Sequence, residues 1–530
     1  MIRRGRTRRR RPRASRRGSA ALALRNIAVA AIAGWTINLA FPTANLWLAA
    51  PIGLALLWSA LEHSGVRGGF GLGMVAGLGF FLPHLWFIDV SAGVVPWLAL
   101  ATVESLAIAL PTAAWCWVRT RKVLEGKMWA EPIVFALLWV AGEQLRSIAP
   151  YGGFPWGRLA FSQIDAPVAA LAWLGGAPLV SFAVAVAGGA LGLAFEAIRG
   201  RRIIISTLGV VGAVAVYASG LAIPLDVAPE SGTLRVGLVQ GNVPDLGLDS
   251  FRQARLVTQN HAEETGRLVA DLPWPPDVVV WAENSADVDP RIDATSYRIV
   301  TDAAIAVGAP ILLGTNDYSP EDGRYNTALL WSTDGEAIAF YIKQHPVPFA
   351  EYLPLRTLAQ AVSEAADRLT TDMLPGDRVG LIALPSGRLG RDVPLGDVIC
   401  FEVAYDPLIR SSVLAGAEIV VVQTNNATFG ATNESEQQFA MTRMRAIETG
   451  RVAIQVSTVG VSGFVLPDGS VVSKTGLFTA EHLAEEVPLR TSITPAMRIG
   501  GVLGFCFLVL PVSLWLIRWL MSLRGRWDWD

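Results

Sequence analysis

The sequence predicts a two-part fold: an α-helical membrane domain of about eight spans, with a polar α/β domain inserted before the last span. Three observations support this prediction. Of the 530 residues, 52% are hydrophobic and 17% are charged; long apolar runs fill residues 22–225; and short β-rich runs alternate with helical ones after residue 230. A composition this apolar is unusual for a wholly soluble protein, so part of the chain is expected to lie in lipid.

The membrane domain is predicted from runs of suitable length, because a helix needs about 20 mostly apolar residues to cross the hydrocarbon core. We place spans at residues 22–39, 46–61, 70–88, 94–118, 129–145, 168–197, 203–224 and 497–520. The expected divisions are a basic terminus at 1–21, seven spans within 22–225, a polar domain at 230–492, the eighth span at 497–520 and a tail at 521–530.

The orientation of the spans is predicted from Lys and Arg in the short connections, which favour the cytoplasmic side. The Arg run at residues 3–17, Arg67, the basic residues of 119–127 and those of 199–202 alternate with less basic connections. Seven crossings from the cytoplasm then place the polar domain on the extracytoplasmic face. We interpret the Arg run as a topology anchor and expect no nucleic-acid partner.

The polar domain shows the alternation of strands and helices that is typical of a layered α/β fold. Strands are predicted at 234–240, 278–283, 311–316, 327–332, 338–344, 397–401, 419–424 and 452–456, and helices at 250–272, 294–307 and 434–450. Open α/β sheets tend to place their sites at strand ends. Glu283, Asn316, Cys400, Asn425 and Asn426 stand at such ends, so we expect these segments to converge on one rim.

Cys400 is the cysteine of the polar domain, since Cys116 and Cys506 fall within apolar runs. A lone cysteine is more often a small buried apolar residue than a nucleophile. A thiol becomes nucleophilic when a base or a positive charge promotes its ionisation. The histidines of the domain have no recognisable cysteine-protease setting, and no Cys/His cluster has zinc spacing. We therefore expect no metal and no cofactor, and consider a carboxylate base with a lysine.

Three segments supply those groups in order: WAENS, YIKQHPVPFAEYLP and ICFEVAY. Together they resemble the nitrilase (carbon-nitrogen hydrolase) superfamily, whose Glu, Lys and Cys come from separate strands of an αββα sandwich. With seven spans before the domain and one after it, the chain looks like the membrane-embedded branch, the apolipoprotein N-acyltransferase family. The segments GEQLRS and YGGFPWGRLAFSQ extend this resemblance into the membrane domain.

The resemblance implies a general base at Glu283, an oxyanion-stabilising lysine at Lys343 and a nucleophile at Cys400. It implies a two-step transfer in which a phospholipid acylates Cys400 and the thioester then acylates an apolipoprotein. The acceptor is the α-amine of its diacylglyceryl-modified amino-terminal cysteine, in the last step of lipoprotein maturation. The expected location is the bacterial inner (cytoplasmic) membrane, as a multi-pass protein.

The same resemblance implies a supporting set around these three residues. Glu351 and Glu402 would be supporting carboxylates, because a partly buried ammonium needs compensating charge. Asn326 would line the site. Phe401 replaces a tyrosine that relatives often carry after the nucleophile, and we expect it, with Asn425, to contact substrate.

Arg146 and Arg158 lie between the fifth and sixth predicted spans, on the side opposite the basic connections. Two interpretations stay open: they attract a phosphate headgroup, or they pair with acids such as Glu143.

Three rival functions are weighed against acyl transfer. A membrane-tethered nitrilase-type amidase or hydrolase uses the same residues with water as the acceptor, and the sequence leaves it open. A non-catalytic scaffold for a lipid-linked glycosyltransferase is a second rival. A transporter is disfavoured because the spans carry few ionisable residues that would mark an ion path, Glu104 being an exception.

Overall fold

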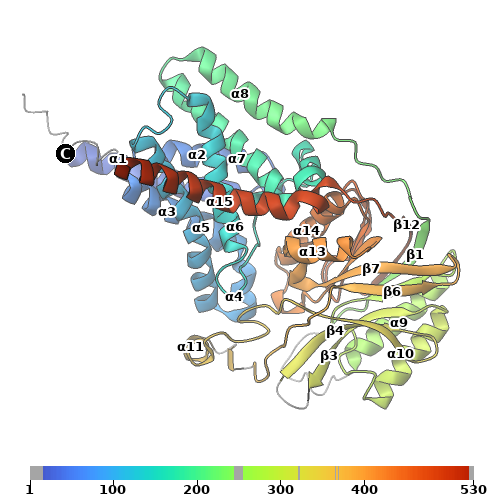
Figure 1. Cartoon of the computed structure of the whole chain (residues 1–530). Helices are drawn as coiled ribbons and strands as arrows, with labels where there is room; N and C mark the ends of the chain where they lie inside the picture. The colour runs from blue at the N-terminus through green and yellow to red at the C-terminus, as the bar shows by residue number, and fades with distance from the viewer. Residues whose placement is uncertain (1–15, 244–254, 320–322, 364–365, 368, 525–530) are drawn as a thin grey trace, which may run out of the picture.

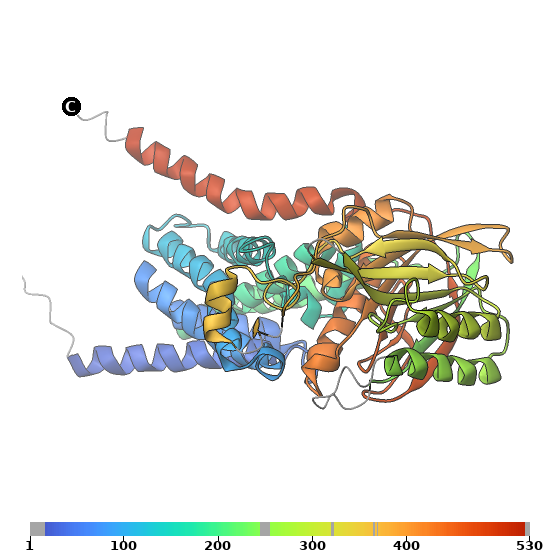
Figure 2. The same cartoon turned by 90° about the horizontal axis from the view of Figure 1, so that it is seen from below.

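A computed structural model of the chain describes residues 16–243, 255–319, 323–363, 366–367 and 369–524. The helices of residues 16–222 form one body, and two β-sheets with their flanking helices form a second (Figures 1 and 2). The last helix, α15 (Pro495–Arg524), runs back along the helical body (Figure 2). The Arg run before residue 16 and the end of the expected tail lie outside the described residues.

The helical body has an α-helix in each of its predicted spans. Its helices are α1 (Arg16–Asn38), α2 (Ala49–Leu61), α3 (Val66–His84), α4 (Trp86–Ala92), α5 (Val94–Thr120), α6 (Glu131–Arg146), α7 (Ala172–Arg199) and α8 (Ile203–Ala218), with 3-10 turns η1 (Met128–Ala130), η2 (Leu159–Ser162), η3 (Pro167–Leu171) and η4 (Ser219–Ala222).

Not every helix of the helical body is long and apolar enough to cross a membrane. Among the described residues, five helical segments are long and apolar enough to cross a membrane: those containing α1, α3, α5, α7 and α8. α2 and the described apolar part of α15 are shorter, and the 16 residues of α6 include two glutamates and one arginine. These helices therefore indicate a membrane protein, but they do not confirm the predicted count of eight spans.

The basic connections of the helical body meet at one end. Arg119 pairs with Glu196 at 2.7 Å, and Arg199 pairs with Glu62 at 2.8 Å. These pairs join the carboxyl ends of α2, α5 and α7, so the amino ends of the same helices point the other way. The connections at that opposite end contact the sheet-containing body, as when Ser363 donates to the carbonyl oxygen of Ala92 at 3.2 Å.

The second body is an αββα sandwich. Its first sheet has the order β12-β1-β2-β3-β4-β5 and its second the order β11-β10-β9-β8-β7-β6. The strands are β1 (Thr233–Gln240), β2 (Val278–Trp281), β3 (Ile311–Ser319), β4 (Gly323–Trp331), β5 (Ala337–Ile342), β6 (Leu381–Ser386), β7 (Arg391–Ile399), β8 (Ile419–Thr424), β9 (Ala453–Ser457), β10 (Gly463–Val465), β11 (Val471–Lys474) and β12 (Glu481–Pro488).

Aliphatic side chains fill the space between the two sheets, among them Val236 and Val280 from the first and Leu395 and Val421 from the second. Helices α9 (Leu256–Asp271) and α10 (Ala294–Val307) cover the outer face of the first sheet, and α13 (Asp406–Leu414) and α14 (Glu434–Thr449) cover that of the second (Figure 1). A further short helix, α11 (Arg356–Val362), lies beside the helical body (Figure 2).

Two differences from the predicted elements have physical causes. The four unpredicted strands β6, β10, β11 and β12 lie at or next to sheet edges: β10 and β11 are short, β6 contains Pro385, and β12 reads EHLAEEVP and pairs antiparallel with β1. The strand predicted at 397–401 ends at Ile399, where the backbone turns. The start of the helix predicted at 250–272 falls on residues that are not described, and the described helix begins at Leu256.

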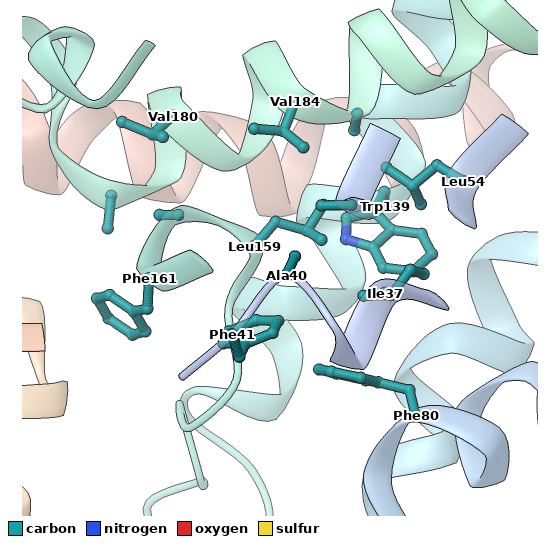
Figure 3. Close-up of a cluster of buried hydrophobic side chains, with 14 of the residues drawn as sticks. Ile37, Ala40, Phe41, Leu54, Phe80, Trp139, Leu159, Phe161, Val180 and Val184 are labelled. Atoms are coloured by element: carbon teal, nitrogen blue, oxygen red, sulfur yellow. The ribbon is translucent and has the colours of Figure 1, made fainter. Parts of the chain in front are cut away.

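The two bodies share one hydrophobic core. A continuous cluster of buried side chains runs from the membrane helices through the η2 region to Phe401, Phe439 and Met444 of the sandwich. Figure 3 shows its helical part, where Phe41 and Leu159 lie between the packed helices. Because α14 buries its face against this cluster, the sandwich is positioned directly over the helical body.

Helix α7 is kinked where it meets the sandwich. Gly175 and Gly176 have non-helical backbone angles, and Gly176 has φ 70° and ψ −174°, a region open almost exclusively to glycine. A Cβ atom at Gly176 would collide with the carboxylate of Glu448 on α14. The kink therefore lets a sandwich carboxylate approach the backbone of a membrane helix.

We expect Gly176→Ala to destabilise the protein by about 1 to 3 kcal/mol from the backbone angle, with a further loss from the collision with Glu448. The measurement is the thermal unfolding midpoint in detergent. Gly212→Ala on α8 is the matched control, because a Cβ there meets nothing within 4 Å and its unfolding midpoint should not fall. Equal midpoints for Gly176→Ala and the wild type would contradict this account of the kink.

Candidate active site

Three strand ends of the sandwich bring Glu283, Lys343 and Cys400 to one place. Glu283 follows β2, Lys343 follows β5 and Cys400 follows β7. The Lys343 ammonium lies 3.6 Å from the Glu283 carboxylate. Both charges act on the pKa of Cys400, which Glu283 raises and Lys343 lowers. The structure thus gathers the three side chains that the sequence singles out.

Lys343 is a fully buried cation held by two carboxylates. Its Nζ donates to Glu351 Oε1 at 2.7 Å, and Glu351 Oε2 accepts from the backbone N–H of Val347 at 2.7 Å. Burial lowers the pKa of Lys343, but Glu351 and then Glu283 outweigh that effect and raise it above its ordinary value. Lys343 therefore stays charged and presents a fixed positive centre to the site.

Glu283 is a buried carboxylate with raised proton affinity. Its Oε1 accepts a hydrogen bond of 2.5 Å from Asn326 Nδ2 on β4, and the backbone N–H of Asn425 also donates to it. Burial raises the pKa of Glu283 above the usual carboxyl value, while Lys343 and the two hydrogen bonds oppose that rise. A carboxylate with a raised pKa is suited to accept a proton and return it.

Cys400 stands at the sharp turn that ends β7. Its φ is 56°, a left-handed conformation that side chains other than glycine rarely adopt, and it starts the 3-10 turn η6 (Cys400–Ala404). Part of its surface is exposed. Burial and Glu283 raise the pKa of the thiol, against the opposing effect of Lys343. The resting group is therefore a thiol, and its ionisation requires a base.

Glu402 holds this turn in place. Its Oε2 accepts from the backbone N–H of Ile399 at 2.8 Å, and its Oε1 accepts from those of Gln344 and His345 at 2.7 and 2.9 Å. The hydroxyl of Tyr341 donates to the same carboxylate at 2.9 Å. Glu402 is fully buried, so these donors fix the end of β7 against the segment that follows β5.

Phe401 packs into an aromatic cluster that the membrane domain supplies. Its ring stacks with Phe154 and Trp156, with centroids 5.2 and 6.0 Å away, and meets the edge of Tyr405 at 5.2 Å. Phe154 and Trp156 belong to the connection between α6 and η2. One wall of the turn that carries Cys400 is therefore built by a loop of the helical body.

Arg146 and Arg158 are both buried and ion-paired. Arg146 binds Glu104 at 3.0 Å and donates to the carbonyl oxygens of two residues of the α6–η2 connection. Arg158 binds Asp406 at 2.8 Å. Both arginines therefore pair with acids, although with Glu104 and Asp406 and not with Glu143. We propose no headgroup role for either, because both side chains are buried within the protein.

Asn425 contacts the site through its backbone. Its side-chain oxygen accepts from the hydroxyl of Thr458 at 2.8 Å, so the amide is engaged within the protein. Asn316 donates to Asn284 at 2.9 Å, beside the end of β2.

Sequence reasoning missed a polar group behind Cys400. Gln438 of α14 donates to the Cys400 sulfur at 3.7 Å, and Glu434 lies one helical turn before it. Their spacing of four residues was visible in the helix predicted at 434–450. The run ESEQQ is polar on all sides, however, so the sequence could not indicate which of these residues face the core.

Two family models match the chain. Residues 33–190 match the model described as the apolipoprotein N-acyltransferase N-terminal domain, and residues 264–493 match the model described as carbon-nitrogen hydrolase. The first range covers most of the helical body, and the second covers most of the sandwich, including Glu283, Lys343 and Cys400.

Curated relatives cover nearly the whole chain. An apolipoprotein N-acyltransferase of Mycolicibacterium smegmatis is 37% identical over 93% of this chain and 84% of its own length. One of Azotobacter vinelandii is 29% identical over 89% and 90%, respectively. Among solved structures, an amidase of Nesterenkonia sp. is similar with a TM-score of 0.36 and 17% identity, over 52% of this chain and 96% of that one.

Proposed function

The chain belongs to the apolipoprotein N-acyltransferase family, and from that premise we propose that it acylates lipoproteins through a thioester on Cys400. The proposed donor is a phospholipid, and the proposed acceptor is the α-amine of a diacylglyceryl-modified amino-terminal cysteine. The observation that supports the mechanism most directly is the distance of 3.6 Å between the Lys343 ammonium and the Glu283 carboxylate. The charges of both groups change the pKa of the Cys400 thiol, so the three side chains lie close together.

In the first step, the Glu283 carboxylate takes the proton of the Cys400 thiol, and the sulfur attacks the ester carbonyl carbon of the donor. The carbonyl oxygen becomes an oxyanion, which the Lys343 ammonium stabilises. The C–O bond of the ester then breaks. The departing alkoxide receives the proton from Glu283, so that a lysophospholipid leaves and a thioester remains.

In the second step, the acceptor amine attacks the thioester carbonyl, and Glu283 takes a proton from its nitrogen. The new C–N bond forms as the C–S bond breaks. The sulfur regains the proton from Glu283, which restores the resting thiol and carboxylate. Lys343 stabilises this second oxyanion in the same position, so one charged group serves both half-reactions.

The contact surface between the sandwich and the membrane helices supports a lipid donor, because it places apolar side chains beside Cys400. The aromatic wall beside Cys400 includes Phe154 and Trp156 from the helical body. The segment that follows Lys343 exposes apolar side chains, with Phe349, Leu355 and Leu358 each about half exposed or more, at 49%, 62% and 61%. Withdrawing an acyl chain into water costs about 0.8 kcal/mol per CH₂, so a site at the membrane surface avoids that cost.

We propose that the sandwich faces the outside of the bacterial cytoplasmic membrane, because the basic connections gather at the opposite end of the helical body. The test introduces Asp334→Cys in the sandwich or Lys122→Cys in a basic connection, both exposed positions. A membrane-impermeant maleimide should label the first residue in intact cells and the second after permeabilisation only. Labelling in the reverse pattern, read by mass spectrometry, contradicts this orientation.

The central prediction concerns Cys400→Ala. Membranes that contain the wild-type chain should add one acyl group to a diacylglyceryl-cysteine peptide in the presence of phospholipid, and membranes with Cys400→Ala should add none. The mass of the peptide is the measurement. Cys506→Ala is the matched control, because it removes a thiol of α15 and should leave the transfer intact.

The same assay separates acyl transfer from hydrolysis. Free fatty acid without any acylated peptide would identify a membrane-tethered hydrolase with the same three residues. If the wild type and Cys400→Ala gave equal yields of acylated peptide, Cys400 would not be the nucleophile.

The pH dependence of kcat/KM reports on Glu283, which must be ionised to act as a base. Asn326→Ala removes a hydrogen bond that lowers the pKa of Glu283, so that pKa should rise further above its ordinary value. The acid limb of the profile should therefore move to higher pH, by about one unit. Asn260→Ala on α9, outside the site, is the control. If the acid limb of the kcat/KM profile lay at the same pH in Asn326→Ala and in the wild type, Asn326 would have no effect on the proton transfer by Glu283.

A further inference from the structure

The sulfur of Cys400 has a polar neighbour that belongs to none of the three motifs recognised in the sequence. Gln438 is fully buried on α14, and its Nε2 lies 3.7 Å from Cys400 Sγ in hydrogen-bonding geometry. This amide reaches the sulfur from the α14 side, whereas Glu283 and Lys343 come from the first sheet. The sulfur therefore has a neutral hydrogen-bond donor, Gln438, in addition to the charged side chains of Glu283 and Lys343.

The orientation of the Gln438 amide is fixed by its other end. Its Oε1 accepts from the hydroxyl of Thr424 at 3.0 Å and from Asn426 Nδ2 at 2.9 Å. A flipped amide would place its NH₂ group against both donors and its oxygen against the sulfur. Because two donors are already committed to the oxygen, the N–H must face Cys400.

Asn426 is held in turn by two further groups. Its Oδ1 accepts from the hydroxyl of Ser457 at 2.5 Å, and its Nδ2 also donates to Glu434 Oε2 at 2.7 Å. Burial raises the pKa of Glu434 to about 8 against the lowering effect of the hydrogen bond from Asn426, and the charge of Glu283 adds to the rise. The raised pKa reduces the negative charge that Glu434 places beside a sulfur that must ionise.

We propose that Gln438 is a further catalytic residue, whose N–H stabilises the Cys400 thiolate, and that Thr424, Asn426 and Glu434 position it. The donor acts twice, when the thiol loses its proton and when the sulfur leaves the thioester. Hydrogen bonds to charged groups are stronger than those to neutral ones, so this contact favours the ionised sulfur over the thiol. The inference rests on the proposed role of Cys400 as nucleophile.

The test uses Gln438→Met in the full-length protein, because methionine is similar in length to glutamine and lacks an N–H donor. The first measurement is the rate of alkylation of Cys400 by iodoacetamide at pH 8, read at that residue by mass spectrometry. Below its pKa, a thiol reacts in proportion to its thiolate fraction. We expect alkylation of Cys400 to slow about tenfold and acyl transfer to fall by a similar factor.

Thr424→Val is the second variant, since it leaves Gln438 in place and removes a hydroxyl that orients Gln438 and that also lowers the pKa of the Cys400 thiol directly. Alkylation of Cys400 should slow by a smaller factor, about threefold. Glu436→Gln is the matched control, because Glu436 lies on the same helix and pairs with Lys474 at 3.3 Å on the surface. Cys400 in this variant should be alkylated at the wild-type rate. Cys506 in each protein is an internal reference for reagent and pH.

Equal alkylation of Cys400 in the wild type and in Gln438→Met overturns the inference, as does an equal fall in Glu436→Gln. If Gln438→Met does not fold, as judged by its thermal unfolding in detergent, an unchanged rate in Thr424→Val overturns it instead. The proposed function itself would fail on a different result, namely acyl transfer by Cys400→Ala. The alkylation rate and the acyl-transfer activity can be told apart, because alkylation is measured without lipid or peptide.

Discussion

The site is organised around a buried ammonium. A cation removed from water is stable when carboxylates and hydrogen bonds replace its hydration, and Lys343 has Glu351 at 2.7 Å and Glu283 at 3.6 Å. Satisfying that one charge requires the end of β2, the end of β5 and the segment after β5 to meet. This arrangement supplies the positive centre for an oxyanion, and burial at the same place raises the pKa of Glu283 against the opposing effect of Lys343.

The turn that carries Cys400 is held from two sides. Glu402 joins it to the segment after β5, and Arg445 of α14 donates to the carbonyl oxygens of Val403 and Ala404 at 2.8 and 2.9 Å. Arg445 also pairs with Asp406, which in turn pairs with Arg158 from the helical body. A chain of buried charges therefore connects the membrane domain to the backbone beside the reacting sulfur.

Much of this architecture was predictable from the sequence, for identifiable reasons. Long apolar runs and β-rich runs gave the two bodies, and the motifs around Glu283, Lys343 and Cys400 identified a site whose parts the structure brings together. What the sequence left open depended on tertiary pairing. The pairing of Arg146 with Glu104 joins residues 42 positions apart, and that of Arg158 with Asp406 joins residues 248 apart. Gln438 was hidden in a wholly polar run, because burial of one face cannot be read there.

The hydrophobic cluster shared by the two bodies has a consequence for how the chain reaches its final form. During synthesis the helices up to α8 leave the ribosome before the sandwich, and the apolar face of α14, with Phe439 and Met444, emerges later. An isolated sandwich would expose that face to water and would tend to self-associate. The membrane helices therefore serve as an intramolecular template on which the enzyme domain completes its folding, and secretion of that domain as a free hydrolase is disfavoured.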